Sequence, residues 1–286
     1  MLPRIDVISF IFALEFIRYM SEIIGYFASA LIGISLGLIG GGGSILTVPV
    51  LVYLFHQDTV ISTSYSLFIV GMTSLVGAIP KFKQGLIDMR TAIVFGVPSI
   101  IAVYLTRLLI VPAIPGTVFY LGSLEITKSL FLLLLFAVLM VAAAYSMIRS
   151  NGVTKPSVPK EERIYNYPVI LLEGLVVGTL TGLVGAGGGF LIIPALVLLS
   201  GLPMKEAVGT SLLIIAAKSL FGFTGDFGHY DLNWTLLISV TSIAIVGIFI
   251  GNMLTRKFDG EKLKRGFGWF VLITGIYIII KEVWLK

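Results

Sequence analysis

Cysteine is absent from this chain of 286 residues. Its absence excludes a disulfide framework and any metal site built from thiolates. Histidine occurs only twice, as His56 and His229, which is too little for a metal centre with several histidine ligands. We therefore predict that the protein works without a metal ion or another cofactor.

Charge is also scarce. Charged residues make up 12% of the chain, whereas soluble domains carry about a quarter. Hydrophobic residues make up 57% and the mean hydropathy is +1.04, so we predict an all-α polytopic membrane protein. The net charge is +5, but Lys and Arg gather in short loops between apolar runs. There they are expected to orient the chain in the membrane, and we predict no nucleic-acid partner.

Eight apolar stretches are long enough to cross a bilayer, which takes roughly 17–25 residues. Two further pieces, 44–55 and 189–200, are too short to cross upright, and the sequence leaves open whether they re-enter or cross at a tilt. Each of them follows a glycine cluster and contains a proline. The eight predicted spans are 23–39, 61–80, 91–111, 127–148, 168–184, 206–224, 234–253 and 267–283.

The chain divides into two halves that repeat. We predict an amphipathic N-terminal segment at 1–22, a first transmembrane repeat at 23–148, a polar cytoplasmic linker at 149–167 and a second repeat at 168–286. A shift of 145 residues lays the first half on the second without a gap for about 50 residues. The shift carries Gly33 to Gly178, Gly37 to Gly182, Pro49 to Pro194, Ser66 to Ser211 and Gly77 to Gly222.

Loop charges predict that the two repeats are inverted. Cytoplasmic loops carry an excess of Lys and Arg. The best assignment places 81–90, 149–167 and 254–266 inside, and 107–128 and 226–233 outside. Loop 81–90 and its counterpart 226–233 then lie on opposite sides. Inverted repeats are a common plan of secondary transporters, with the substrate near the midplane between broken helices.

Two glycine clusters, GLIGGGGSILTVP at 37–49 and GLVGAGGGFLIIP at 182–194, predict such breaks. Glycine runs are poor helix interiors, and backbone N–H groups freed at a break can hold an oxyanion. Close helix–helix packing is the competing explanation. No Lys-Ser or Lys-Thr follows, so neither cluster is a P-loop. The candidate binding residues are Gly40, Gly42, Gly43, Ser44, Gly185, Gly187, Gly188 and Gly189.

Hydroxyl side chains recur at equivalent places after the two clusters. Ser64 and Ser66 in the first half, and Thr210 and Ser211 in the second, are expected near the start of apolar helices. They are candidates for binding an anion, and helix capping explains Ser64 and Thr210 equally well.

Lys218 lies well inside an apolar run, GTSLLIIAAKSLFGF. An ionisable residue within the membrane is costly and marks a functional-site candidate. Alternatively, the lysine reaches an interface or pairs with a buried carboxylate such as Glu173. In contrast, Asp226, His229 and Asp231 are expected to line the outer loop at the surface.

The doubled motif resembles that of the TauE/SafE family of sulfite exporter-like permeases. Both clusters fit G-L-(I/V)-G-x-G-G-(G/S)-x-(L/I)-x-x-P, and Tyr65-Ser66-Leu67 and Thr210-Ser211-Leu212 follow them. The resemblance covers about residues 25–280. Tyr65 replaces the usual Thr, and Lys218 is not part of the family motif.

The resemblance implies export of sulfite or a related small sulfur-containing anion, such as an organosulfonate, across the cell inner membrane. The expected partners are this small anionic substrate and the lipid bilayer, with a homodimer left open. The mechanism we predict is alternating access by a multi-pass secondary transporter. An anion channel of the same fold stays an alternative, and an intramembrane enzyme is a weaker one, because no serine has an evident catalytic partner.

Overall fold

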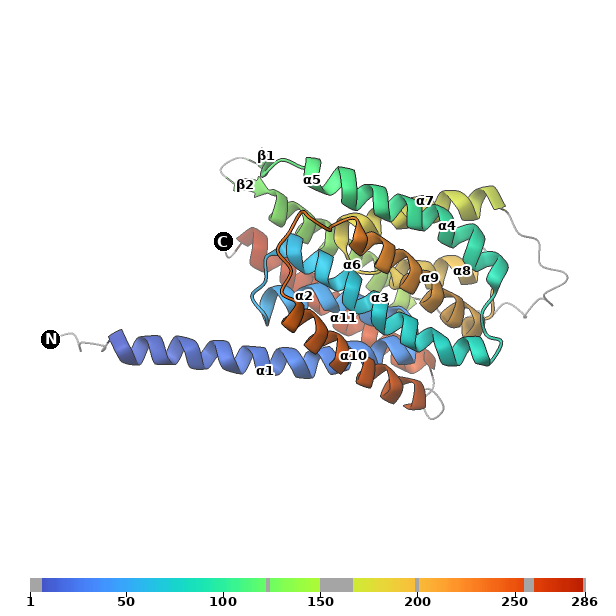
Figure 1. Cartoon of the computed structure of the whole chain (residues 1–286), viewed down its shortest axis with the longest axis horizontal. Coiled ribbons are helices and arrows are strands. Elements are labelled where there is room, and N and C mark those ends of the chain that lie inside the picture. The colour runs from blue at the N-terminus through green and yellow to red at the C-terminus, as the bar shows by residue number, and fades with distance from the viewer. Residues whose placement is uncertain (1–6, 122–123, 150–166, 199–200, 255–259, 285–286) are drawn as a thin grey trace.

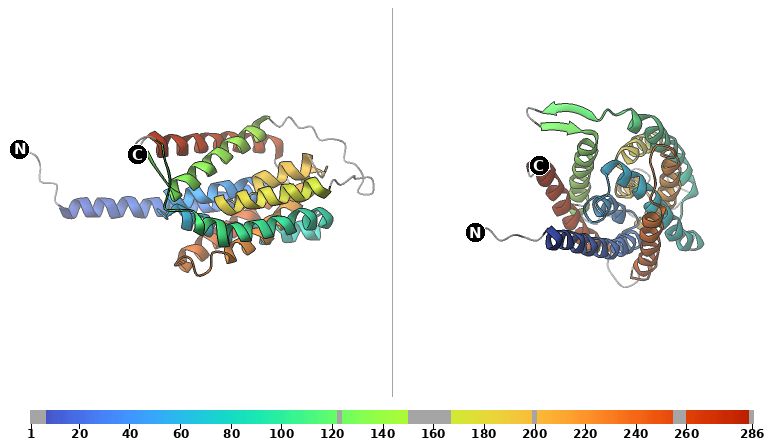
Figure 2. Two further views of the ribbon diagram at one scale, coloured as in Figure 1. Left: turned by 90° about the horizontal axis from the view of Figure 1, so that it is seen from above. Right: turned by 60° about the vertical axis from the view of Figure 1, so that its left-hand side comes forward.

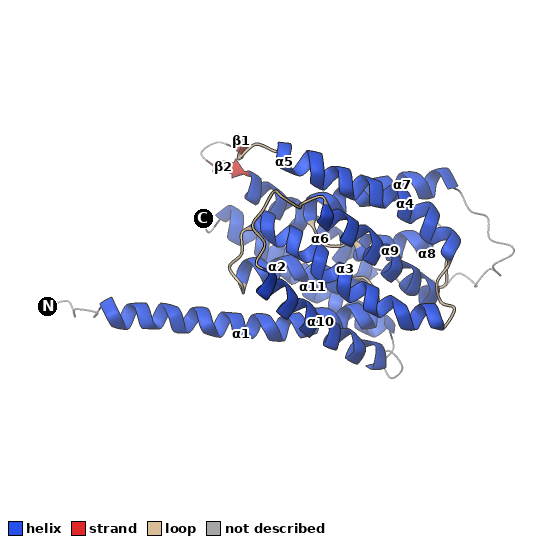
Figure 3. Cartoon of the chain, viewed as in Figure 1, coloured by secondary structure: helices blue, strands red, loops and turns tan. Residues whose placement is uncertain are grey.

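The protein is a bundle of long helices with one small β-hairpin (Figures 1 and 3). The computed structural model describes residues 7–121, 124–149, 167–198, 201–254 and 260–284. Within these ranges, eight helices are long and apolar enough to cross a membrane, which confirms the all-α polytopic class. The main helices are α1 (Val7–Ile39), α2 (Thr47–Tyr53), α3 (Thr59–Lys83), α4 (Met89–Leu105), α6 (Lys128–Arg149), α7 (Tyr167–Val184), α8 (Gly189–Leu198), α9 (Met204–Thr224), α10 (Trp234–Leu254) and α11 (Gly260–Trp284).

The first helix begins earlier than its predicted span. Helix α1 starts at Val7 and continues without a break to Ile39, so the described part of the N-terminal segment 1–22 is continuous with the first span. This part extends beyond the rest of the bundle (Figure 1). The linker residues 150–166 lie outside the described residues.

The predicted outer loop 107–128 is partly structured. Helix α4 passes into a π-helical turn, η2 (Thr106–Ile110), and a short helix, α5 (Val111–Ala113). A hairpin of β1 (Thr117–Leu121) and β2 (Leu124–Thr127) follows. Threonine, valine, isoleucine and aromatic residues in these strands favour extended backbone over helix.

The two short apolar pieces are half-helices in the centre of the bundle. Helix α8 has 10 residues and is therefore about 15 Å long. Helices α7 and α9 both begin at the end of the bundle where α3 ends and α4 begins (Figures 1 and 2), so α8 turns back toward that end. Helix α2 turns back toward the opposite end, where α3 begins. Both half-helices are buried, as Val48, Leu51, Ile192 and Leu196 are each 0% exposed.

Small residues let the outer helices approach closely, and these contacts repeat between the halves. A Cβ atom on Gly33 of α1 would collide with the carbonyl oxygen of Ala244 on α10, and one on Gly178 of α7 with that of Ser99 on α4. Ala244 and Ser99 are themselves 145 positions apart. For these two glycines the packing explanation is therefore correct.

A second pair of contacts follows the same shift. Gly77 lies against Ile248, and its counterpart Gly222 lies against Val103, which is 145 positions before Ile248. Helix α1 also enters the bundle from one end and α7 from the other (Figure 1). These features support a two-fold relation between the halves, and the inverted repeat stays a prediction.

The close approach of α1 and α10 can be tested with Gly33→Ala. The added methyl group has no space beside Ala244, so we expect the free energy of unfolding in detergent to fall by about 1–3 kcal/mol. Gly96→Ala is the matched control, because the added atom would be 3.8 Å from Ile214. The control should stay within about 1 kcal/mol of the original protein. Equal effects of the two substitutions would contradict this account of the helix contact.

Candidate anion site

The two glycine clusters meet at the centre of the bundle. A Cβ atom on Gly41 would lie 2.5 Å from the carbonyl carbon of Gly189, and one on Gly189 would lie 2.5 Å from the Cα atom of Gly41. The backbones of the two clusters therefore touch, and no side chain fits between them. One break from each half of the chain contributes to this central contact.

The first break is a tight turn between α1 and α2. Gly40 has a positive φ of 81°, and a 3₁₀ helix, η1 (Gly42–Leu46), follows. Gly43 lies against the Ser35 hydroxyl of α1. The Ser44 hydroxyl donates a hydrogen bond of 2.8 Å to the carbonyl oxygen of Gly41, so this serine supports the turn itself.

The second break reverses the chain between α7 and α8. Gly185, Gly187 and Gly188 have φ values of +73°, +65° and +64°, which residues with a Cβ atom rarely adopt. Gly189 then begins α8. The break thus depends on glycine for its backbone conformation as well as for space.

Lys218 lies at this second break. Its side chain is 0% exposed, and Nζ donates a hydrogen bond of 2.9 Å to Thr181 Oγ1 on α7. A Cβ atom on Gly188 would be 2.7 Å from Nζ. The lysine does not reach an interface and does not pair with Glu173, and no carboxylate among the described residues forms an ion pair with it. Both alternative explanations of Lys218 are therefore wrong.

Ser66 faces the second break from α3. Thr63 contacts Gly185 and Val70 contacts Gly187, and Ser66 lies between them on the same helix face. Its hydroxyl oxygen is buried and has no hydrogen-bond partner among the described residues. Ser66 is thus a polar group available to a ligand.

Ser64 is also buried and without a partner among the described residues, but it lies off the face of α3 that contacts the break. It does not cap its helix, because α3 begins at Thr59 and Asp58 is the N-cap, with its side chain accepting from Val60 N at 2.7 Å. The capping explanation for Ser64 is therefore wrong.

The hydroxyls of α9 already have partners. Thr210 accepts a hydrogen bond of 2.9 Å from the backbone N–H of Asp88, which joins the second half to the start of α4. Helix α9 begins at Met204, so Thr210 does not cap its own helix. Ser211 donates to the carbonyl oxygen of Val208 at 2.9 Å. Since Val208 contacts Gly40, Ser211 lies on the face of α9 toward the first break.

A buried ion pair lies near the second break, and sequence reasoning missed it. Asp226 was expected at the surface, but its side chain is 1% exposed and pairs with Arg107, which is 0% exposed. Arg107 Nε and Nη2 donate to Asp226 Oδ2 at 2.9 and 2.5 Å. His229 and Asp231 are exposed, as predicted. Arg107 interrupts the apolar run IAVYLTRLLIVP, so the argument that singled out Lys218 applies to it as well.

Comparison with known proteins agrees with this architecture. The family model described as "Sulfite exporter TauE/SafE" matches residues 26–278. The chain belongs to the TauE/SafE family. A "Probable membrane transporter protein" of Xylella fastidiosa strain Temecula1 is 29% identical over 257 residues, covering 88% of this chain and 92% of the relative. "Probable membrane transporter protein YunE" of Bacillus subtilis strain 168 is 27% identical over 263 residues, covering 86% and 93%. No solved structure matches the chain.

This TauE/SafE protein is therefore a multi-pass membrane protein of a transporter family. Membership of this family implies that the protein lies in a lipid bilayer and has a small-molecule substrate. It also suggests a non-enzymatic role. Among the residues that the structure describes, no three His, Asp or Glu side chains come together in a way that could hold a metal ion.

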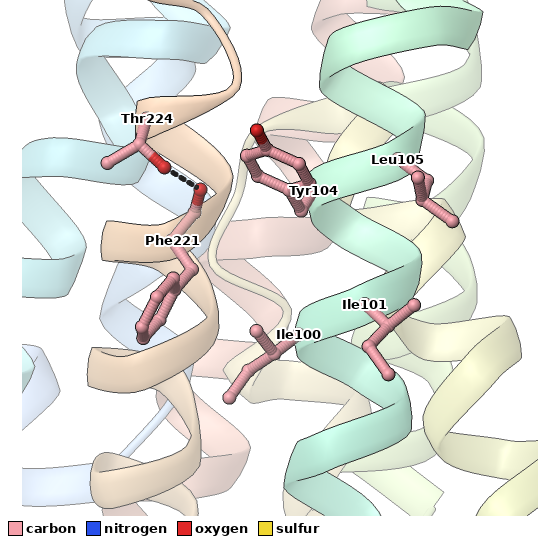
Figure 4. A pocket seen from close by; sticks show the side chains of 6 residues that line it. All are labelled: Ile100, Ile101, Tyr104, Leu105, Phe221 and Thr224. Carbon is pink, nitrogen blue, oxygen red and sulfur yellow. Dashed lines mark hydrogen bonds between the residues drawn. The ribbon is translucent and has the colours of Figure 1, made fainter.

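A groove of about 410 Å³ on the outside of the TauE/SafE bundle does not resemble an anion site. Ile100, Ile101, Tyr104 and Leu105 of α4 line it together with Phe221 and Thr224 of α9 (Figure 4). The Thr224 hydroxyl donates to the carbonyl oxygen of Phe221, which leaves an almost wholly apolar lining. This groove suits the hydrocarbon of the bilayer.

The buried ion pair should make a large contribution to stability. Arg107→Ala leaves the Asp226 carboxylate buried without its cation, so we expect the free energy of unfolding to fall by about 3–5 kcal/mol. Unfolding of the detergent-solubilised protein would measure the change. Asp231→Ala removes an exposed carboxylate close by and should change stability by no more than about 0.5 kcal/mol. An Arg107→Ala protein as stable as the original would show that the pair is not formed.

Proposed function

We propose that this protein is a secondary transporter that exports sulfite, or a related small sulfur-containing anion such as an organosulfonate, across the cytoplasmic membrane. One observation carries the proposal. The Lys218 ammonium group lies at the glycine break of α7 and α8, fully buried and without an ion-pair partner among the described residues.

The charge of Lys218 favours an anionic ligand. An ammonium group within a membrane protein is costly unless an opposite charge or several hydrogen bonds compensate it. Thr181 supplies one hydrogen bond. A small oxyanion beside Gly188 would compensate the charge and accept hydrogen bonds from Lys218, Ser66 and the backbone N–H groups of the break.

The arrangement of the two breaks favours a carrier. The breaks come from different halves of the chain and touch at Gly41 and Gly189. A rocking motion of one half against the other would open the site alternately to either side without separating the residues that hold the anion. The family description names sulfite export, and sulfite carries a negative charge that Lys218 would compensate.

Efflux from proteoliposomes tests the proposal. Vesicles loaded with sulfite would be compared with vesicles loaded with sulfoacetate or sulfate, with and without an imposed pH gradient. We expect saturable sulfite efflux that responds to the gradient. Efflux that does not saturate and ignores the gradient would favour an anion channel, and no flux of any sulfur anion would reject the substrate assignment.

Replacing the ammonium group should abolish most of the flux. Lys218→Met keeps the length of the side chain but removes the charge, so we expect sulfite efflux to fall by about 10–100-fold, the equivalent of a lost charge-assisted hydrogen bond. Lys205→Met is the matched control, because Lys205 is on the same helix but exposed. Unchanged efflux in Lys218→Met would remove the lysine from the site.

Ser66 should affect affinity without supporting the fold. Ser66→Ala removes a hydroxyl that has no partner among the described residues, so stability should be unchanged or slightly higher, while the apparent KM for sulfite should rise by about 2–10-fold. In Ser29→Ala, the lost hydroxyl donates to the carbonyl oxygen of Gly25 at 2.7 Å. That control should lower stability and leave the KM unchanged. The opposite pattern would place Ser66 outside the site.

A further inference from the structure

The Arg107–Asp226 pair has an unusual geometry for a purely structural ion pair. Both Nε and Nη2 of the guanidinium donate to the same oxygen, Asp226 Oδ2. The other oxygen, Oδ1, is buried and has no hydrogen-bond partner among the described residues. A structural Arg–carboxylate pair commonly engages both oxygens in two parallel bonds. Here one of the two carboxylate oxygens has no hydrogen bond from the described residues.

Arg107 is adjacent to the proposed anion site. Its Nη1 donates to Thr63 Oγ1 at 2.9 Å and to the carbonyl oxygen of Gly182 at 3.2 Å. Thr181, the residue before Gly182, accepts the hydrogen bond from Lys218. Two buried cations therefore contact consecutive residues at the end of α7. One has a carboxylate of the protein as its partner, and the other has none among the described residues.

Several ionisable groups surround the pair at the end of the bundle that loop charges predict to be outside. Lys128 at the start of α6 interacts electrostatically with both members of the pair and with Asp58 at the start of α3. Tyr230 follows α9, and burial raises the pKa of its phenol, which therefore stays protonated. His229 and Asp231 of the same loop are exposed. Lys128 is thus a second cation in the surroundings of Asp226.

We propose that Arg107 is a second anion-binding residue, on the outer side of Lys218, and that the Asp226 carboxylate occupies it as an internal anion while that end of the bundle is closed. An oxyanion leaving Lys218 would displace Asp226 from the guanidinium before release. The proposal rests on the proposed function and adds a second binding step to it.

The Arg107–Asp226 pair does not repeat at the positions related to it by the 145-residue shift. The 145-residue shift carries Arg107 to Asn252 and relates Asp226 to Lys81. A cation and an anion therefore cannot meet at the equivalent positions. At these equivalent positions the two ends are therefore chemically different.

Asp226→Asn tests the proposal, because it removes the competing negative charge and keeps the shape of the side chain. We expect the apparent KM for sulfite to fall by about tenfold or more, the equivalent of a lost charged hydrogen bond. Sulfite should also raise the melting temperature of Asp226→Asn more than that of the original protein. Asp231→Asn makes the same charge change at an exposed position and should alter neither value. An unchanged or higher KM in Asp226→Asn, with no added stabilisation by sulfite, would overturn the proposal.

A charge swap gives a second test that does not depend on Asp226→Asn folding. Arg107→Asp combined with Asp226→Arg keeps one charge of each sign in the pair but removes the guanidinium of Arg107 from Gly182. We expect sulfite efflux to fall by about tenfold or more at near-original stability. Efflux equal to that of the original protein would show that the pair is only structural.

The two proposals fail in different ways. If the original protein moves no sulfur anion, the proposed function fails. Melting temperatures with sulfite, sulfate and chloride would then still report whether Asp226→Asn gains an anion site, and no gain with any of them would overturn the second anion site. If the original protein transports sulfite and the charge swap transports it equally well, the second anion site alone fails.

Discussion

The backbone contact between Gly41 and Gly189 is the constraint on which the rest of the structure depends. In the apolar interior of a membrane, a helix can break only where protein, water or ligand satisfies the freed backbone groups. Each half supplies one break, and the two lie against each other with no room for a side chain. The half-helices α2 and α8 must therefore turn back, and the longer helices enclose them.

Glycine contacts recur between the two halves of the chain, but the buried charges do not. Lys218 corresponds to Thr73, and Arg107 corresponds to Asn252. If the two halves are related by a two-fold axis, the site would open to both sides of the membrane through similar backbone. The buried cations would then make the electrostatic environment differ between the two openings. Arg107 is buried against a carboxylate of the protein, whereas Lys218 has no ion-pair partner among the residues that the structure describes. We therefore expect Arg107 to contribute to the stability of the bundle and Lys218 to contribute to the proposed transport.

Much of the fold could be predicted because its signals are local. Hydrophobic runs predicted all eight spans, and proline and glycine located both half-helices. The ends of the helices were predicted less well, because they depend on packing and capping. Helix α1 begins at Val7, before the predicted span, and a hairpin follows α5. For the site, sequence reasoning identified Lys218 but placed Asp226 at the surface. Asp226 follows the last turn of α9, and no local pattern indicates that Arg107, 119 positions away, reaches it.

By itself, the sequence determined the membrane environment, the number of spans, the repeat and the two breaks, because each depends on residues close together in the chain. Only the tertiary structure decided which polar groups meet. It brought Lys218 to Thr181, left Ser66 without a partner among the described residues, joined Thr210 to Asp88 and buried Asp226 against Arg107. These pairings depend on distances between helices that are remote in the chain. Such distances follow from how the glycine contacts let those helices pack.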